Sequence, residues 1–375
     1  MKNNAPWILA IAAVCLTISV ASTGQAGPLD ADQVSADAKW VMHMDFEAMR
    51  ESSAGKMMRS MWLQRDRVRK RMEEVLEHTG MDPREDLDGA TLYDNQFKKH
   101  HGVALIHVKN IDKSRSLETL REKHPDARTV TYEGHEIHTW QGRHKKHEHT
   151  VTAALYEGSV IVMSRDIPDV MQALDVLDGR ADALSDSSPL ADDTRGGTIL
   201  TLRAIDMDEA DLPGKCSVLQ QSEQLSWAAG QDDDTLFLNC SLITKSDEIA
   251  NNVASVTDGL RALVALRHGE HEDVMRVIDG LESETDGKSV TVEWEAEGGD
   301  VMKAVGGMIA HHHLHGKKHH RHWWKHKRHG HHHHGDDDDD EEDDDEEEED
   351  DDDHHRRRAW WKKMKEQYQK SLHRT

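Results

Sequence analysis

Apolar and polar residues alternate along many short stretches of this chain, and this period of two predicts β-strands. Two turn signals, Glu133-Gly134 and Glu157-Gly158, each separate a pair of such stretches and predict hairpins. A third hairpin is expected around residues 230–234. The strands expected from alternation are residues 39–46, 102–108, 128–132, 135–141, 150–156, 159–164, 198–205, 225–229, 235–243 and 289–297.

Other stretches repeat their apolar residues every three or four positions, which predicts amphipathic helices. The longest, residues 47–78, is expected as one helix or as a broken pair that ends at Gly80 and Pro83. Shorter helices are expected at 117–123, 166–177, 246–266 and 274–281. In the helix at 246–266 the apolar residues share one face, which we expect to pack on a sheet; they are Ile249, Val253, Val256, Leu260, Leu263 and Val264.

This order of elements predicts an α+β protein with two related antiparallel sheet halves and helices packed on one side. The first half is expected at residues 36–180 and the second at 198–309. The segment 181–197 between them is rich in Ala, Asp, Ser and Gly and is interpreted as a linker. Residues 102–112 and 196–206 have a similar pattern, which indicates either an internal duplication or two α+β halves that are alike by coincidence.

The strand that reads Trp-Val-Met-His-Met-Asp-Phe at 40–46, followed by a helix and by repeated hairpin–helix units, resembles families of exported bacterial proteins with no assigned function. The resemblance covers roughly residues 38–305 and lies in the pattern of elements. It implies a duplicated α+β sheet with helices on one side. It implies no residue roles.

The N-terminus predicts export. Lys2, an apolar run over residues 7–20 and the small residues that end at Ala26 describe a secretory signal peptide at residues 1–26. The alternative is a retained anchor, although the run is shorter than the roughly 20 residues of a bilayer span. No membrane span is expected after cleavage, and the protein is expected in the periplasm or outside the cell. Export would permit a disulfide between Cys216 and Cys240, with two buried thiols as the alternative.

The C-terminal segment, residues 310–375, differs in composition from the rest. It holds a histidine-rich block, then 18 consecutive carboxylates at 336–353, then a basic end with aromatic residues. Its apolar content is too low to offset the entropy of ordering, so a disordered tail is expected. The 13 histidines of the first block are His311, His312, His313, His315, His319, His320, His322, His326, His329, His331, His332, His333 and His334.

Charge is divided unevenly between the two parts. The chain carries a net charge of −25, of which the tail contributes −5 because its basic blocks offset most of the acidic run. Residues 27–310 carry −21 and are acidic in their own right. A body of this charge argues against a nucleic-acid partner.

The body contains no motif that indicates a reaction. It has no Cys-x-x-Cys pair, no Gly-x-Ser-x-Gly elbow and no His-Glu-x-x-His helix. His144, His147 and His149 lie close together in an expected hairpin and form a weak metal candidate, with a solvated cationic loop as the alternative. Four tryptophans, Trp40, Trp140, Trp227 and Trp294, lie in expected strands and are interpreted as packing residues.

The tail carries the clearest chemistry. Neutral imidazoles bind Zn²⁺, Ni²⁺ or Cu²⁺, and carboxylates offer weak oxygen ligands to Ca²⁺ or Mg²⁺. We expect an exported non-enzymatic protein whose tail binds cations or an envelope or protein surface. One alternative is a transition-metal buffer or delivery protein that uses the tail histidines, and another is an enzyme of undetermined type in the body.

A synthetic peptide of residues 311–355 tests metal binding by the tail. We expect calorimetry to detect Zn²⁺ binding at about pH 7.5 and its loss near pH 5, because protonated imidazoles repel the ion. No heat signal at the higher pH would contradict the expectation.

Overall fold

The structure is a computed structural model that describes residues 29–304, apart from residues 64, 99–100, 110, 145–146, 192–194 and 208–216. The described residues all belong to one compact unit. The expected signal peptide (1–26) and the expected tail (310–375), with its thirteen histidines, lie outside them.

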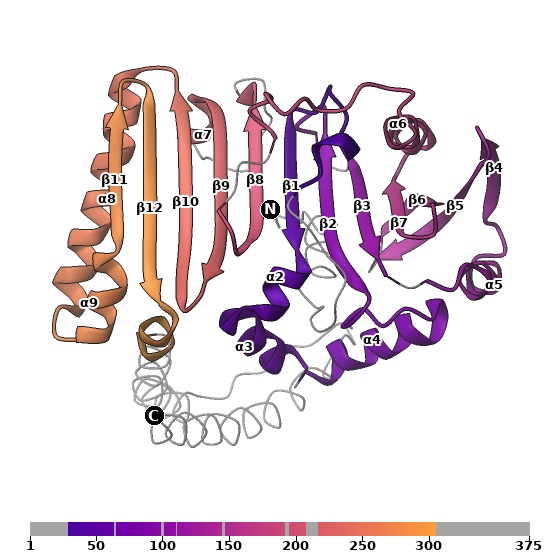
Figure 1. The fold of residues 1–375 in the computed structure, drawn as a ribbon, viewed down its shortest axis with the longest axis horizontal. Coiled ribbons are helices and arrows are strands. Elements are labelled where there is room, and N and C mark those ends of the chain that lie inside the picture. The colour runs from indigo at the N-terminus through magenta and orange to yellow at the C-terminus, as the bar shows by residue number, and fades with distance from the viewer. Residues whose placement is uncertain are drawn as a thin grey trace, which may run out of the picture. The chain divides into compact units, whose positions relative to one another are not determined.

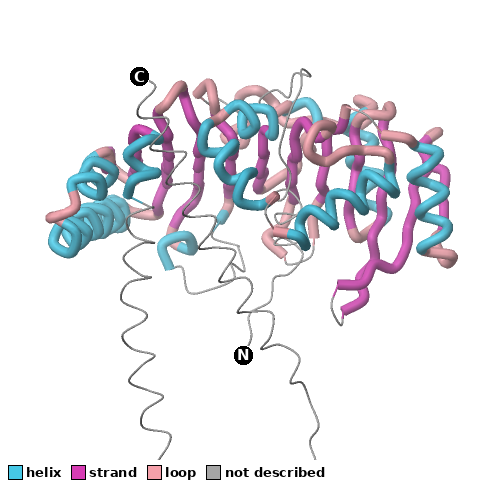
Figure 2. Tube along the Cα trace, turned by 90° about the horizontal axis from the view of Figure 1, so that it is seen from below, coloured by secondary structure: helices cyan, strands magenta, loops and turns pink. Residues whose placement is uncertain are grey.

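A single antiparallel sheet of twelve strands organises the described part of the chain (Figure 1). Figure 2, turned to a view from below, shows the strands as one continuous layer. Their order across the sheet is β11-β12-β10-β9-β8-β1-β2-β3-β7-β6-β5-β4. The strands are β1 (Trp40–Asp45), β2 (Leu87–Asp94), β3 (Val103–Val108), β4 (Arg128–Tyr132), β5 (His135–His144), β6 (His147–Tyr156), β7 (Val160–Ser164), β8 (Thr198–Ile205), β9 (Ser222–Asp232), β10 (Thr235–Thr244), β11 (Leu281–Asp286) and β12 (Ser289–Glu297).

Both halves follow the same path through the sheet. In each, three strands run outward from the centre (β1-β2-β3 and β8-β9-β10), and a helical connection then crosses to the outer edge. The chain returns inward from that edge by four strands in the first half and by two in the second. By its place in the path, β8 corresponds to β1 of the first half. By the sequence similarity between 102–112 and 196–206, β8 corresponds to β3 instead. The two matched segments therefore occupy different places in their halves, and the duplication stays a prediction.

The two halves meet where β1 pairs with β8 along its length. Met44 lies opposite Leu200 and Trp40 opposite Ala204. On its other side β1 pairs with β2 from Trp40 to Asp45. Since β1 is the sixth of the twelve strands in their order across the sheet, the two halves join close to its centre.

The helices divide between the two faces of the sheet. We name the faces after one helix each: the α6 face carries Val41 and Val103, and the α8 face carries Met44 and Ala104. The α6 face holds the short 3₁₀ turn η1 (Ala31–Gln33) and α6 (Ile167–Leu177). The remaining helices are α2 (Phe46–Glu51), α3 (Ser53–Trp62), α4 (Asp66–Thr79), α5 (Lys113–Lys123), α7 (Ser217–Gln220), α8 (Asp247–His268) and α9 (Glu272–Asp279).

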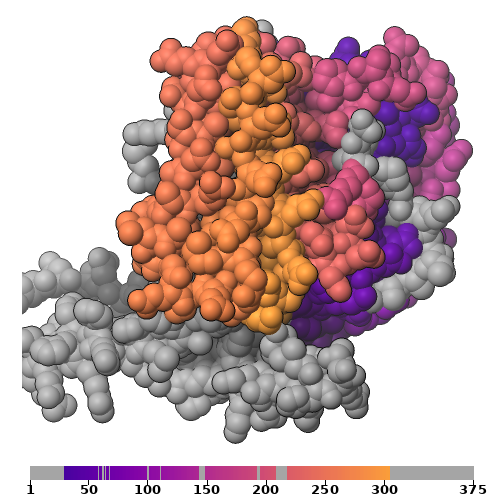
Figure 3. Space-filling view, turned by 60° about the vertical axis from the view of Figure 1, so that its left-hand side comes forward, coloured from indigo at the N-terminus to yellow at the C-terminus, as the bar shows by residue number. Residues whose placement is uncertain are grey.

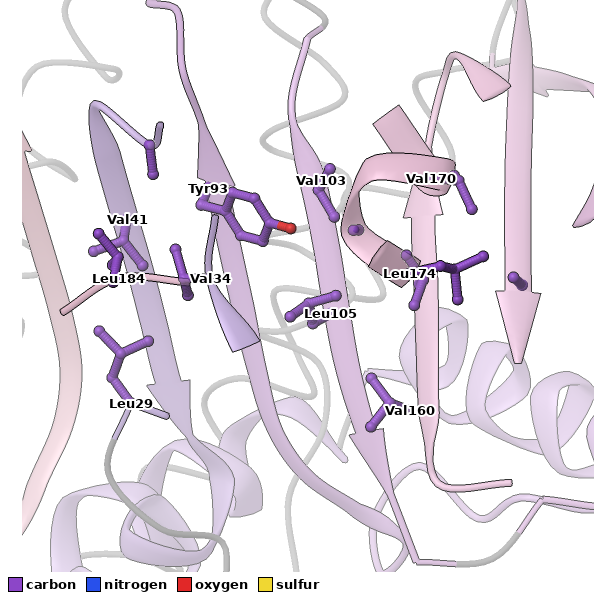
Figure 4. Close-up of a cluster of buried hydrophobic side chains, with 14 of the residues drawn as sticks. Leu29, Val34, Val41, Tyr93, Val103, Leu105, Val160, Val170, Leu174 and Leu184 are labelled. Carbon is purple, nitrogen blue, oxygen red and sulfur yellow. The ribbon is translucent and has the colours of Figure 1, made fainter. Parts of the chain in front are cut away.

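A core on the α6 face joins α6 to the first half of the sheet (Figure 4). Val170 and Leu174 of α6 are fully buried there with Leu105 of β3. The segment interpreted as a linker contributes Leu184 and Leu190, which are also buried. Leu184 and Leu190 show that the connection between the two halves also packs on this face.

A second core, on the α8 face, fixes α2 against the sheet. Phe46 and Met49 are buried there, and the guanidinium of Arg50 donates to the carbonyl of Leu87. That guanidinium also lies 3.5 Å from the carboxylate of Asp88, which pairs with Lys109 at 3.0 Å. The buried cation therefore has partners on β2, as a desolvated charge requires.

The long helix α8 packs differently from the expectation. Ala250, Leu242 and Val290 are buried together, with Val253 and Ala254 beside them. Four large apolar side chains of α8 face outward instead of packing on the sheet. Three of them, Val256, Leu260 and Leu263, belong to the expected shared face, so the expectation is wrong for three of its six members. The exposed fractions are 72% for Val256, 53% for Leu260, 60% for Leu263 and 87% for Leu266. Figure 3 shows this edge of the second half from outside, in orange.

The α+β class with two antiparallel halves is confirmed. The expected helix over 47–78 is broken into α2, α3 and α4. Two strands were not expected from the sequence, β2 near the centre and β11 at an edge. Cys240, half-buried on β10, carries a free thiol, and burial raises its pKa. Cys216 lies outside the described residues.

We expect replacement of the buried carboxyl of Asp45 by an amide to stabilise the fold in a pH-dependent way. It caps α2 by accepting the N–H of Ala48 at 2.8 Å, and burial raises its pKa to about 6. A carboxyl whose folded pKa is raised stabilises the fold only while it is protonated and destabilises it as pH rises through the folded value. Asp45→Asn keeps the cap and removes the buried charge. We expect Tm to rise by about 2–4 °C near pH 7, or about 1 kcal/mol, with no gain near pH 4. An equal gain at both pH values would contradict this explanation.

Candidate functional site

An apolar groove of about 420 Å³ lies between helices α4 and α5 and the outer strands of the first half. Its floor is the α8 face of β5, β6 and β7. The strand register aligns His138, Ala153 and Met163 in one row across these strands. A second row holds Leu155 and Ile161. All five side chains are half-buried, so the floor is open from above.

The walls of the groove come from α4 and α5. Val75 of α4 and Leu117 and Leu120 of α5 turn apolar side chains toward it. Three hydrogen bonds hold the helices together. Thr119 Oγ1 donates to the carbonyl of His78 at 2.9 Å, and the N–H of Asp112 and the hydroxyl of Ser116 donate to the carbonyl of Thr79 at 3.2 Å and 3.5 Å. These bonds fix α5 against α4, so the two walls form one unit beside the strands.

Charged side chains mark the rim. Three of the lining residues are cationic and exposed, Arg71, Lys113 and Lys123, and two are exposed carboxylates, Glu74 and Glu136. Lys113 pairs with Glu136 at 3.0 Å, which ties α5 to β5. The rim thus carries a small positive excess in a body whose net charge is −21.

Three histidines line the groove, and one lies on its floor. Burial lowers the pKa of His138, and Thr129 Oγ1 lies 2.9 Å from its Nδ1. His138 is therefore neutral near neutral pH and adds little charge to the floor. The ring of His124, the C-cap residue of α5, lies beside that of Trp140 with ring centroids 6.0 Å apart. The third, His78, lies on α4.

The groove has the size and the lining of a small-molecule pocket. Pockets for small molecules are mostly apolar, with a few polar groups that orient the ligand, and commonly measure about 300–1,000 Å³. The lining residues include no cysteine, and no hydrogen bond links its histidines to a serine or carboxylate side chain among the described residues. Among those residues, the groove histidines also do not form a group close enough to hold a metal ion.

The hairpin histidines lie at the far end of β5 and β6. His144 pairs directly with His147, and Gly142 pairs with His149. By strand alternation, His149 shares the α8 face with Ala153 and Leu155. The side chains of His144 and His147 are outside the description, so the weak metal candidate stays a prediction.

Of the four strand tryptophans, only Trp140 lines the groove. Trp40 donates its Nε1–H to the carbonyl of Gln96 at 2.9 Å, and Trp294 donates to that of Val277 at 2.7 Å. All four are half-buried, consistent with packing roles. The sequence signal that was missed is the pair His138 and Trp140 on one strand face, with the small Ala153 opposite His138 on the next strand.

Comparisons with known proteins give little to add to this geometry. No protein-family model matches the chain, and no curated protein matches it. Among solved structures, crystal forms III, IV and I of a protein named TP0453 align with TM-scores of 0.41, 0.39 and 0.38. Each alignment has 6% sequence identity and covers 75% of this chain, and 99%, 97% and 98% of the other chain respectively. Likeness of this degree carries no argument about fold or function.

Within the residues that the structure describes, no helix is long and apolar enough to cross a membrane.

Proposed function

We propose that this protein is an exported, non-enzymatic binding protein whose groove takes a small amphipathic molecule with an apolar body and an anionic head. The observation that carries the proposal is the pairing of an apolar groove of about 420 Å³ with a rim of cations from α4 and α5. Export rests on the N-terminal sequence alone.

The apolar part of the ligand would lie on the floor. Ala153, Leu155, Ile161 and Met163 leave half-buried carbon surface there that no other described side chain covers completely. Removing such surface from water is favourable by about 25 cal/mol per Å². A single alkyl chain is the simplest shape that follows a groove between a sheet and two helices.

The head would lie at the rim, near Arg71 and Lys123. These two cations belong to different helices and face the same opening, and Lys113 is already paired with Glu136. Local positive charge in an acidic body favours an anion at this place over other places on the surface. The net negative charge of the body as a whole favours cations over anions. A preference for an anionic head group therefore distinguishes binding in the groove from non-specific attraction to the surface.

A second role, cation binding by the tail, rests on sequence composition. The thirteen histidines at 311–334 are suited to Zn²⁺, Ni²⁺ or Cu²⁺, and the acidic run at 336–353 to weak Ca²⁺ or Mg²⁺ binding. The groove and the tail are independent proposals.

Calorimetric titration of the full chain with amphiphiles of one chain length tests the groove. We expect dodecanoate to bind, dodecanol to bind more weakly, and dodecyltrimethylammonium to bind at least about tenfold more weakly than dodecanoate. Ala153→Met fills the floor and should weaken dodecanoate binding by about tenfold, equivalent to about 1.4 kcal/mol. Lys123→Glu should weaken the binding of dodecanoate and leave the binding of dodecanol unchanged.

Matched variants control for general effects. Ala228→Met changes a half-exposed strand position in the other half of the sheet, and Lys70→Glu changes an exposed residue of α4 that does not line the groove. Both should leave dodecanoate binding unchanged. Tighter binding of the cationic amphiphile, or equal effects of the groove variants and their controls, would refute the proposal.

A further inference from the structure

A group of metal-capable side chains lies away from the groove, where β3 begins and α6 begins. One ligand atom from each of His101, Asp166 and Asp169 lies within 4.8 Å of those of the other two. His101 precedes β3, Asp166 is the N-cap residue of α6, and Asp169 lies in its first turn. His101 lies at least 65 positions before the two aspartates in the chain, and the packing of α6 on the sheet brings the three residues together.

Helix geometry alone does not account for this group. Carboxylates at the N-terminus of a helix are stabilised by its dipole, which explains acidic residues in the first turn of α6. However, the side chain of Asp166 makes no capping hydrogen bond. One oxygen of Asp169 accepts the hydroxyl of Ser164 at 2.8 Å, and the dipole gives no reason for an imidazole beside these carboxylates.

A buried carboxylate beside the group supplies an independent observation. Asp94, at the end of β2, is 7% exposed, and its Oδ2 has no hydrogen-bond partner among the described residues. Asp94 and Asp169 line the same small cavity of about 30 Å³. The hydroxyl of Tyr93, which is 4% exposed and lines the same cavity, also has no described partner. Figure 4 shows that the Tyr93 ring points toward Val103 of β3. Buried polar atoms left without partners are rare in folded proteins unless an ion or water satisfies them.

The backbone is shaped to bring His101 to this place. Gly102 has a φ of +111°, and a Cβ at that position would lie 3.0 Å from the carbonyl oxygen of Tyr93 and 3.4 Å from the Cβ of Asp94. Only glycine adopts this conformation without strain. The turn before β3 therefore passes directly over Asp94.

We propose that His101, Asp166 and Asp169 bind a divalent transition-metal ion, with the Asp94 carboxylate lining the cavity beside it. One imidazole and two carboxylates make a mixed nitrogen and oxygen donor set, which Zn²⁺ and Mn²⁺ accept. The ion would connect the start of β3 to the first turn of α6 and would satisfy carboxylates that repel one another without it. The site lies among residues of the body and is separate from the tail histidines.

Uptake of metal does not discriminate between this site and the tail, so the experiment measures stability. An ion that binds only the folded state raises Tm, whereas histidines that bind metal equally before and after the sheet unfolds add no stability. Thermal unfolding of the full chain is followed with Zn²⁺, with Mn²⁺ and with a chelator. We expect Zn²⁺ to raise Tm by about 5 °C over the chelated protein.

Variants locate the effect. Asp169→Asn keeps an acceptor for Ser164 and should abolish the shift, as should His101→Ala. Asp186→Asn, an exposed residue outside the group, should keep it. If Asp169→Asn does not fold, Asp166→Asn replaces it, because the side chain of Asp166 makes no capping hydrogen bond that the change would remove. The proposal is overturned by an absent shift in the unchanged protein, by a shift that survives His101→Ala and the Asn variants, or by a shift that Asp186→Asn also removes.

Discussion

The pairing of β1 with β8 is the constraint on which the described structure depends. Each half contributes its first strand to the centre, and the other strands of each half add outward from that pair. Backbone groups at the centre of a sheet need partners on both sides, so separating the halves would leave the inner edges of β1 and β8 without hydrogen bonds. Phe46 and Met49 follow β1 at once and bury α2 on the α8 face, which fixes the same strand from above.

The groove follows from the way the first half returns toward its centre. In the second half only two strands return, and α8 covers the strands directly by packing Ala250 on Leu242 and Val290. In the first half four strands return, and α5 reaches their outer edge while resting on α4. The wider sheet leaves strand surface under the two helices that neither helix fills. A difference in strand number between two similar paths therefore produces the binding surface.

Alternation of apolar and polar residues predicts ten of the strands, because those strands have one buried face or belong to hairpins with strong turn signals. It does not reveal β2, whose residues Asp88, Gly89 and Asp94 break the pattern although the strand is almost entirely buried. It also misses β11, an edge strand of mostly polar residues. Periodicity identifies the apolar residues of α8 but does not show which of them pack on the sheet. The groove and the His101 group combine residues that are far apart in the sequence, so no local spacing of residues predicts either of them.

Hydrogen exchange on the full chain, with and without dodecanoate, tests the binding groove most directly. The two apolar surfaces that compete for an amphiphile are the groove and the outward side of α8 with Val256, Leu260 and Leu263. Ligand in the groove slows exchange only where backbone amides are shielded or local opening is suppressed. The account predicts protection in α4, α5 and β5–β7 with none in α8. Protection confined to α8, or no protection anywhere, would contradict it.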